Sequence, residues 1–183
     1  MRFVYGRLLS DMSVEQPEIG TIALTGTTGY VGGRLVARLL HEGYRLKCLV
    51  REPKKLQRRS WVNDELVEIV QCDLDDFDVT TRALEGCCTA YYLVHSMSES
   101  GHRSASRNRR LASTFARSAE SAGVDRIVYL GELLDPDTSL DANSSLRFEV
   151  EQALTSRSVP VTVFRTGIII GSGSASFEIL RYL

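Results

Sequence analysis

The chain has 183 residues, of which 43% are hydrophobic and 25% charged, an ordinary composition for one globular α/β domain with a full core. The formal net charge of -1 gives no reason to expect nucleic acid or an anionic membrane as a partner. No run approaches the ~20 apolar residues that a membrane-spanning helix needs.

The four cysteines form no C-x-x-C pair, which argues against both a metal site and a disulfide framework: Cys48, Cys72, Cys87 and Cys88. We expect reduced core thiols, no bound metal and a cytoplasmic location. Residues 1–19 lack a signal-peptide cleavage pattern and are expected to form a flexible leader, with either Met1 or Met12 as the true start.

The first strong pattern is I-A-L-T-G-T-T-G-Y-V-G-G, at residues 22–33. Its apolar start predicts a strand over 22–24, its glycines predict a tight turn, and the helical period after them predicts a helix over 30–41. A strand, a glycine turn and a helix in this order form the first unit of a dinucleotide-binding fold.

Each glycine in this turn has a physical reason. Gly26 and Gly29 allow unusual backbone angles and a close approach of the main chain to a pyrophosphate, and Gly32 allows the helix to pack on the strand. The helix N-terminus favours an anion. Hydroxyl donors surround the turn at Thr25, Thr27 and Thr28. The pattern therefore indicates a phosphate loop, and the alternative is a glycine turn that only serves packing.

The strand expected over 45–50 leads into R-E-P-K-K, which begins at Arg51. At this point an acidic residue binds the ribose hydroxyls of NAD, whereas a basic residue accommodates the 2′-phosphate of NADP. Arg51, with help from Lys54, therefore favours NADP(H), while Glu52 leaves NAD(H) open. The alternative is an exposed run of charges without a ligand.

Four further strands are expected over 66–71, 89–95, 127–130 and 159–165, and the further helices are expected over 77–84, 108–122 and 146–156, with a last one from residue 174. Six strands that alternate with helices, almost all buried on both faces, predict a Rossmann-type doubly wound parallel sheet. We expect the strand order 3-2-1-4-5-6, with helices on both faces, over residues 20–183.

In such a sheet the end of the strand over 89–95 lies beside the phosphate loop, at the edge where ligands bind. Leu93, Val94 and His95 are therefore candidate cofactor contacts. His95 is also a weak candidate for a general acid.

The motif T-G-x-x-G-[YF]-[IV]-G, together with residues 91–97, 122–131 and 171–178, resembles the atypical and extended short-chain dehydrogenase/reductase superfamily, and most closely its NmrA-like NAD(P)H-binding group. The resemblance implies that Tyr30 and Val31 belong to the cofactor loop. It also implies that Asp73 and Leu74 flank the adenine, although alone they could equally be a helix cap and a hydrophobic staple.

Active members of this superfamily use a Tyr-x-x-x-Lys pair and a serine, in which a nearby cation lowers the pKa of the tyrosine. Counted without gaps, these positions fall on Asn143, Arg147 and either Gly131 or Glu132. The resemblance makes Asn108 the helix asparagine that shapes the active site. The catalytic residues thus stay unknown, with His95, Asn108 and Arg147 as weak candidates.

Tyr129 and Tyr182 do not replace the missing tyrosine, because Tyr129 lies mid-strand without a lysine four residues later and Tyr182 lies near the chain end. The family builds its substrate pocket after the sixth strand, so we expect this domain to be truncated before that part. Two functions are favoured: an oxidoreductase that passes hydride to a quinone, flavin or small carbonyl acceptor, or a non-catalytic redox-sensing regulator of a protein partner. An isomerase, a dehydratase or a nucleotide-sugar enzyme is the remaining alternative.

Overall fold

Six strands form one parallel sheet in the order β3-β2-β1-β4-β5-β6. They are β1 (Thr21–Leu24), β2 (Leu46–Val50), β3 (Val67–Gln71), β4 (Cys87–Tyr92), β5 (Arg126–Glu132) and β6 (Val161–Thr166). This computed structural model describes residues 20–94, 102–133 and 142–182, so the expected leader over 1–19 lies outside the described residues. The strand order and the parallel pairing confirm the doubly wound sheet that the sequence predicts.

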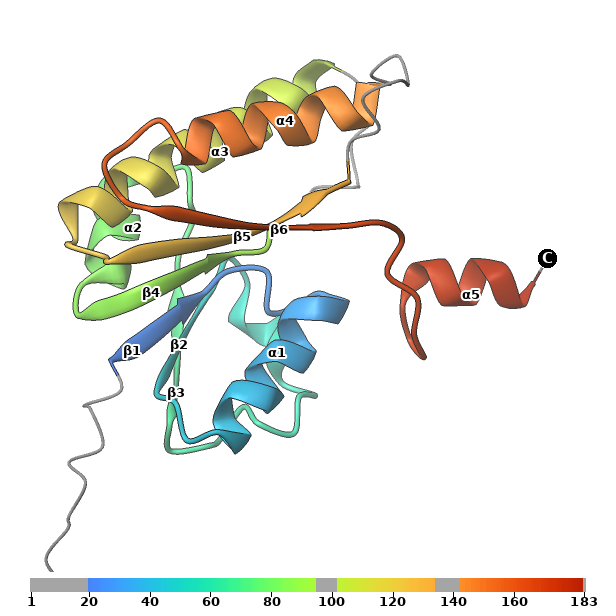
Figure 1. Ribbon diagram of the computed structural model, residues 1–183. Coiled ribbons are helices and arrows are strands. Elements are labelled where there is room, and N and C mark those ends of the chain that lie inside the picture. Colours follow the sequence, from blue (N-terminus) through green and yellow to red (C-terminus); the bar gives the residue numbers. More distant parts are fainter. Residues whose placement is uncertain (1–19, 95–101, 134–141, 183) are drawn as a thin grey trace, which may run out of the picture.

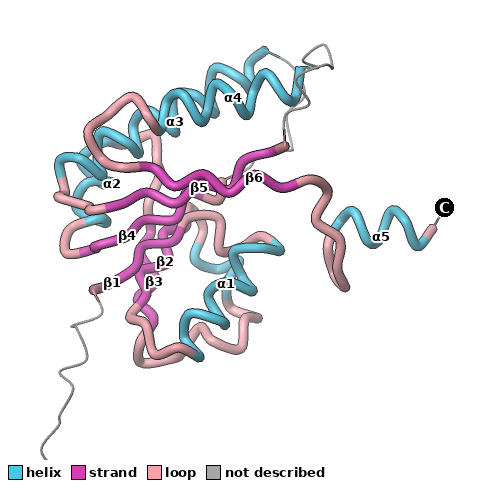
Figure 2. The backbone as a smooth tube through the Cα atoms, in the orientation of Figure 1, coloured by secondary structure: helices cyan, strands magenta, loops and turns pink. Residues whose placement is uncertain are grey.

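Helices cover both faces of the sheet unequally (Figure 1). One face carries α2 (Phe77–Leu84), α3 (His102–Ser121) and α4 (Ala142–Leu154), and the other carries α1 (Tyr30–His41) and the short 3-10 turn η1 (Pro53–Leu56). The last helix, α5 (Ala175–Arg181), lies beyond the carboxyl end of β6 and off the sheet (Figure 2). None of the helices within the described residues is both long and apolar enough to cross a membrane.

Each face of the sheet has its own buried cluster, because successive strand residues point to opposite faces. In β1, Leu24 packs with Val36 of α1, whereas its neighbour Ala23 packs into the cluster under α2, α3 and α4. In that second cluster the rings of Tyr92 and Phe115 lie 5.0 Å apart, centroid to centroid. A shift of one residue in β1 would move each of its side chains to the opposite face of the sheet. Burial on both faces therefore fixes the register of this strand.

Several predicted boundaries are wrong by a few residues. β4 ends at Tyr92 and not at residue 95, because the next amide, that of Leu93, donates to the hydroxyl of Thr25 rather than to a backbone carbonyl. β5 continues to Glu132 because it stays paired with β6 up to Thr166. α3 and α4 begin earlier than the expected residues 108 and 146, at residues 102 and 142, because each helix extends into the polar segment that precedes it.

The two edge strands are not buried on both faces as predicted. β3 contains only half-buried and exposed residues, and Phe164 of β6 is 60% exposed. An edge strand has no neighbour on one side, and α1 does not extend across β5 and β6. Period and composition alone do not distinguish such an edge from an inner strand.

Cysteine placement agrees with core thiols, since Cys48, Cys72 and Cys87 are buried and all four cysteines are free. Burial raises the pKa of Cys48 to about 12 and that of Cys87 to about 11, so these thiols stay protonated near neutral pH. Among the described residues, no group of three or more His, Cys, Asp or Glu side chains is placed to hold a metal ion.

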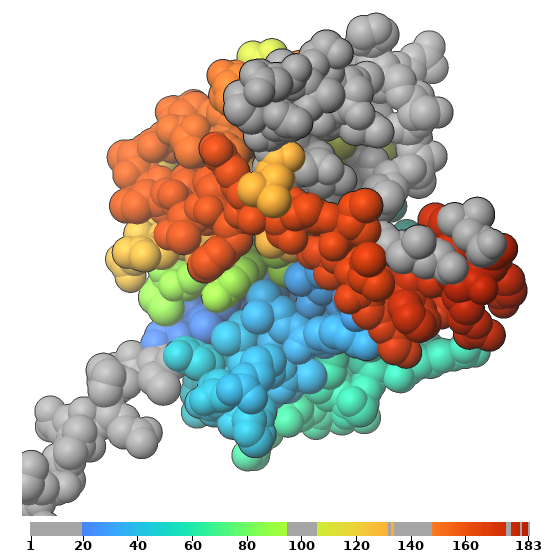
Figure 3. Space-filling model, turned by 45° about the vertical axis from the view of Figure 1, so that its right-hand side comes forward, coloured from blue at the N-terminus to red at the C-terminus, as the bar shows by residue number. Residues whose placement is uncertain are grey.

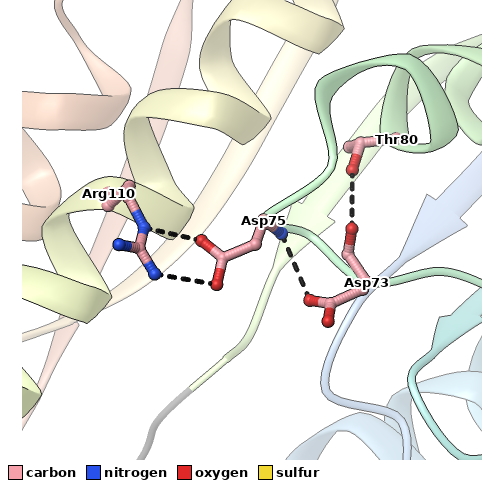
Figure 4. A network of polar contacts seen from close by, with 4 residues as sticks. All are labelled: Asp73, Asp75, Thr80 and Arg110. Atoms are coloured by element: carbon pink, nitrogen blue, oxygen red, sulfur yellow. Dashed lines mark hydrogen bonds and ion pairs between the residues drawn. The ribbon is translucent and has the colours of Figure 1, made fainter.

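An ion pair between Asp75 and Arg110 connects the turn between β3 and α2 to α3 (Figure 4). Arg110 donates two hydrogen bonds to the carboxylate of Asp75, with its Nε at 2.8 Å and its Nη2 at 3.0 Å. Within the turn, the Asp75 amide donates to Asp73 Oδ1 at 3.2 Å, and the Thr80 hydroxyl donates to the Asp73 carbonyl at 3.4 Å. A bidentate pair of this kind holds the two elements in one orientation.

This ion pair predicts a stability change at acid pH. The hydrogen bond from Arg110, and then its charge, lower the pKa of Asp75 below its ordinary value of 3.8. A carboxyl group with a lowered folded-state pKa stabilises the fold above its unfolded pKa and loses that contribution as the pH falls through the folded one. Asp75→Asn should therefore be less stable than the wild type near pH 7, and the difference should shrink below about pH 4.

Denaturant unfolding at a series of pH values measures this difference. Asp125→Asn is the matched control, because Asp125 is exposed and its carboxylate has no hydrogen bond to the described residues. A difference between wild type and Asp75→Asn that stays constant from about pH 6 to about pH 3 would contradict the role of the pair.

Candidate functional site

The carboxyl ends of β1 and β4 lie side by side where the strand order reverses, since the chain builds outward from β1 to β2 and β3, and from β4 to β5 and β6. Such a switch point is where open α/β sheets bind ligands. The glycine turn that follows β1 lies at this point (Figure 1). The sequence prediction of its place in the fold is therefore confirmed.

Thr25 fastens the start of the glycine turn to the end of β4. Its amide and its hydroxyl both donate to the carbonyl of Tyr91, at 2.9 and 3.0 Å, and the hydroxyl accepts from the amide of Leu93 at 2.9 Å. Thr25 is 1% exposed. Its hydroxyl is thus committed within the protein, so the expectation that Thr25 offers a donor to a ligand is wrong.

Two glycines bring backbone against backbone. Gly26 has a φ of +68°, and a Cβ there would meet the carbonyl group of Leu93, whose carbon would lie 2.7 Å away. A Cβ at Gly32 would meet the Gly26 carbonyl, with its carbon at 2.8 Å, and Thr27 Cα at 2.9 Å. A side chain at either position would collide with these backbone atoms. The glycine turn and the first turn of α1 can therefore pack backbone to backbone only because both residues are glycines.

The N-terminus of α1 is left open. Gly29 is the N-cap residue in an extended conformation, no side chain caps the helix, and the first turn contains no acidic residue. The first amides of a helix have no partner within it, and here they belong to Tyr30, Val31 and Gly32. A Cβ at Gly29 would meet only the Gly26 carbonyl oxygen, at 3.2 Å, so there is room for a small side chain at this N-cap position.

These residues fit an anionic group such as a phosphate. The open amides supply donors, the helix dipole favours negative charge, and Thr28 is exposed beside them. Thr27 is fully buried, and its hydroxyl has no hydrogen-bond partner among the described residues. Of the three expected threonine donors, Thr28 therefore has the accessible hydroxyl.

The segment after β2 braces the same turn, which the sequence analysis missed. Arg59 Nη2 donates to the carbonyls of Thr28 and Gly29, at 2.8 and 3.3 Å, and the indole of the buried Trp61 donates to the carbonyl of Gly33 at 3.2 Å. A buried tryptophan N–H requires a hydrogen-bond acceptor. The single tryptophan of the chain was therefore the one signal in the sequence that this segment packs against another part of the fold.

Arg51 lies at the end of β2 with an exposed side chain. Its Nε is 3.9 Å from Glu52 Oε1, whereas Lys55 Nζ lies 2.8 Å from the same oxygen. The hydrogen bond from Lys55 is also the main cause of the lowered pKa of Glu52. Glu52 is therefore paired chiefly with Lys55, and the guanidinium of Arg51 is accessible at the sheet edge.

The remaining predicted contacts fall into two groups. Asp73 is exposed at the edge after β3, whereas Leu74 is buried in the core. The residue that caps α2 is Asp76 and not Asp73, since the carboxylate of Asp76 accepts from the amide of Val79 at 3.0 Å. Leu93 and the half-buried Val94 follow β4 directly beside the glycine turn. His95 lies outside the described residues.

The candidate catalytic residues are not gathered at the turn by any described contact. Asn108 is half-buried on α3, and Arg147 lies on α4 with its side chain outside the described part. Tyr129 is 1% exposed and packs against Tyr92, with ring centroids 6.3 Å apart, and Tyr182 is 80% exposed. Neither tyrosine is placed to act as an acid beside the glycine turn. This agrees with the sequence analysis, which expects neither of them to replace the missing tyrosine.

Residues 18–178 match the NmrA-like family. The chain belongs to this family. Among solved structures, an NADPH-dependent quinone oxidoreductase from Escherichia coli, in complex with NADPH, is 26% identical with a TM-score of 0.67 over 80% of this chain and 48% of that one. Triphenylmethane reductase from Citrobacter sp. has a TM-score of 0.68 at 22% identity, over 81% of this chain and 49% of that one.

Curated relatives of this NmrA-like chain include the 3β-hydroxysteroid dehydrogenase/Δ5→4-isomerase of Mycobacterium tuberculosis, which is 28% identical over 132 residues. That match covers 67% of this chain and 34% of the relative. The chain thus spans about a third of this relative and about half of the two solved structures. Together these findings confirm the family and the Rossmann-type fold.

Proposed function

We propose that this chain binds a nicotinamide dinucleotide and is the cofactor-binding part of an oxidoreductase. This enzyme passes hydride to a quinone, a flavin or a small carbonyl acceptor. The observation that carries the proposal is the open N-terminus of α1 behind Gly26, Gly29 and Gly32, at the switch point of the sheet. Support comes from the similar quinone oxidoreductase and triphenylmethane reductase, both described as NADP(H) complexes.

The residues of this chain have separate tasks in binding. The amides of Tyr30, Val31 and Gly32 hold the pyrophosphate, and the hydroxyl of Thr28 adds a donor. Leu93 and Val94 line the edge next to β4, and Asp73 faces the adenine end after β3. The bound nicotinamide supplies the hydride, and the protein holds its ring at the sheet edge.

Gly29→Asp should separate binding from folding. Asp is a favoured N-cap residue, so stability should be unchanged or slightly higher, by a few tenths of a kcal/mol. The new carboxylate would lie where the pyrophosphate binds, and its repulsion should weaken NADPH binding by about tenfold or more. Gly29→Asn is the matched neutral control, which we expect to bind more tightly than Gly29→Asp. Unchanged NADPH affinity in Gly29→Asp, measured by calorimetric titration, would remove the phosphate from this loop.

NADP(H) is the preferred cofactor in this proposal, because Arg51 is accessible while Glu52 is paired mainly with Lys55. A guanidinium at this position can bind the 2′-phosphate that NAD lacks. Lys54, next along the exposed segment, can add to the positive charge.

Arg51→Ala should weaken NADPH by about tenfold and change NADH by less than about twofold, because only NADPH loses a charge-assisted hydrogen bond. Arg45→Ala is the control, since Arg45 is also exposed but directly precedes β2, at the amino end of that strand. Equal losses for the two nucleotides in Arg51→Ala would argue for NAD(H) or for no preference.

The acceptor in this proposal is a compound that needs little help with its proton. Asn143 and Arg147 stand where the superfamily has its tyrosine and lysine, and an arginine does not give up its proton near neutral pH. A quinone or flavin takes hydride and can receive its proton from water, whereas most carbonyl compounds need a positioned acid.

The test of this proposal is oxidation of NADPH by the purified chain with a quinone and with a flavin, followed at 340 nm. Turnover that disappears in Gly29→Asp would support the reductase. Tight NADPH binding without turnover, in this chain and in a longer version of the protein, would favour the second candidate, a redox-sensing regulator. The absent Tyr-x-x-x-Lys pair is the observation behind that candidate. Buried free thiols agree with a reducing compartment such as the cytoplasm for either function.

A further inference from the structure

The loop that follows β6 returns to the N-terminal turn of α1. Arg34 Nη2 donates to the carbonyl of Ser172 at 2.7 Å, a contact between residues 138 positions apart in the sequence. In the space-filling view, the orange-red segment after β6 lies directly against the blue surface of α1 (Figure 3). Two glycine-containing loops, from the ends of β1 and β6, thus meet at one helix terminus.

Tyr30 forms the second part of this contact. The guanidinium carbon of Arg34 lies 4.2 Å from the centroid of the Tyr30 ring, a cation–π arrangement that orients both side chains. The Tyr30 hydroxyl abuts Gly171 so closely that a Cβ there would collide with it, and the ring carbon Cζ would lie at 3.3 Å. A side chain at Gly171 would therefore displace the Tyr30 ring, whereas the backbone angles of Gly171 do not themselves call for glycine.

The far side of the loop is fixed to α5. The hydroxyl of Ser174 accepts from the amides of Gly171 and Phe177, at 3.2 and 3.1 Å, and Ser174 is buried. The C-terminal part of the loop, at Gly171 and Ser172, is thus held both by the cap of α5 and by Tyr30 and Arg34. We define the Tyr30–Arg34 clasp as these two side chains and their contacts with Gly171 and Ser172.

The strand order decides which half of a dinucleotide this loop would meet. β2 and β3, with Arg51 and Asp73, lie on one side of β1, and β4, β5 and β6 lie on the other. A ligand with its pyrophosphate on α1 and its adenosine toward Arg51 extends its other half toward β4 and the loop after β6. At that side Leu133, Ile168 and Ile170 are all more than half exposed and offer an apolar surface.

We propose that Tyr30 and Arg34 are positioning residues, which hold the loop of residues 167–173 as a second wall over the nicotinamide half of the cofactor site. This inference rests on the proposed dinucleotide binding. The clasp does not touch the adenosine half, so its loss should weaken a whole dinucleotide and spare a fragment that lacks nicotinamide.

The experiment compares NADPH with adenosine 2′,5′-bisphosphate by calorimetric titration of the full chain. Arg34→Met should weaken NADPH by about tenfold, as expected when a hydrogen bond from a charged donor is lost, and leave the bisphosphate within about twofold. Arg38→Met is the matched control, because Arg38 lies one turn later on α1 and pairs with Glu42 at 2.6 Å. It should leave both ligands unchanged.

A size exchange tests the contact from its other side. Gly171→Ala should weaken NADPH because its methyl group meets the Tyr30 hydroxyl, and adding Tyr30→Phe should restore much of the affinity by removing that oxygen. A protein that is merely destabilised would lose affinity for the bisphosphate together with NADPH, so the retained bisphosphate affinity separates the two explanations.

Three outcomes would overturn the inference. Unchanged NADPH affinity in both Arg34→Met and Gly171→Ala would show that the loop is no wall of the site, while the proposed function would stand. Equal losses for NADPH and the bisphosphate would assign the clasp to the whole fold. A wild-type chain that binds neither ligand would contradict the proposed function itself, and the positioning role with it.

Discussion

The rest of the site depends on the close approach of three backbone segments at the end of β1. Gly26 lies against the carbonyl of Leu93, and Gly32 lies against the carbonyl of Gly26, with no room for a Cβ at either glycine. Thr25 stabilises this arrangement, because its amide and hydroxyl donate to the Tyr91 carbonyl and its hydroxyl accepts from the Leu93 amide. Because the turn is fixed in this way, the first amides of α1 point outward at the sheet edge and are not covered by a side chain of their own helix.

Two other parts of the chain use that fixed turn as an anchor. On the side of β2, Arg59 and Trp61 donate hydrogen bonds to carbonyls of the turn and of α1. On the side of β6, Arg34 binds the loop around Ser172. The candidate site is therefore assembled from segments near the beginning, the middle and the end of the chain, which meet at the N-terminus of α1.

Local chemistry explains what the sequence could predict. The glycine spacing and the helical period after it are short-range signals, and they predicted the turn and α1. The alternation of six strands with helices predicted the sheet and its order. The end of β4 was wrong because Thr25, 68 positions before Leu93, replaces a backbone acceptor with a hydroxyl. Arg59 and the Arg34–Ser172 contact carry no local pattern, since their partners are backbone carbonyls, which every residue has. The exposure of β6 depends on which elements lie beside it and is likewise not visible in its own residues.

The most direct test of the account is to identify, residue by residue, which backbone amides contact the bound dinucleotide. Amide ¹⁵N–¹H chemical shifts should be recorded during a titration with NADP⁺. The account predicts large, saturating shifts for Tyr30, Val31 and Gly32 and for the backbone around Arg51, with little change in α3. Saturable binding that leaves the amides of Tyr30, Val31 and Gly32 unshifted would contradict it.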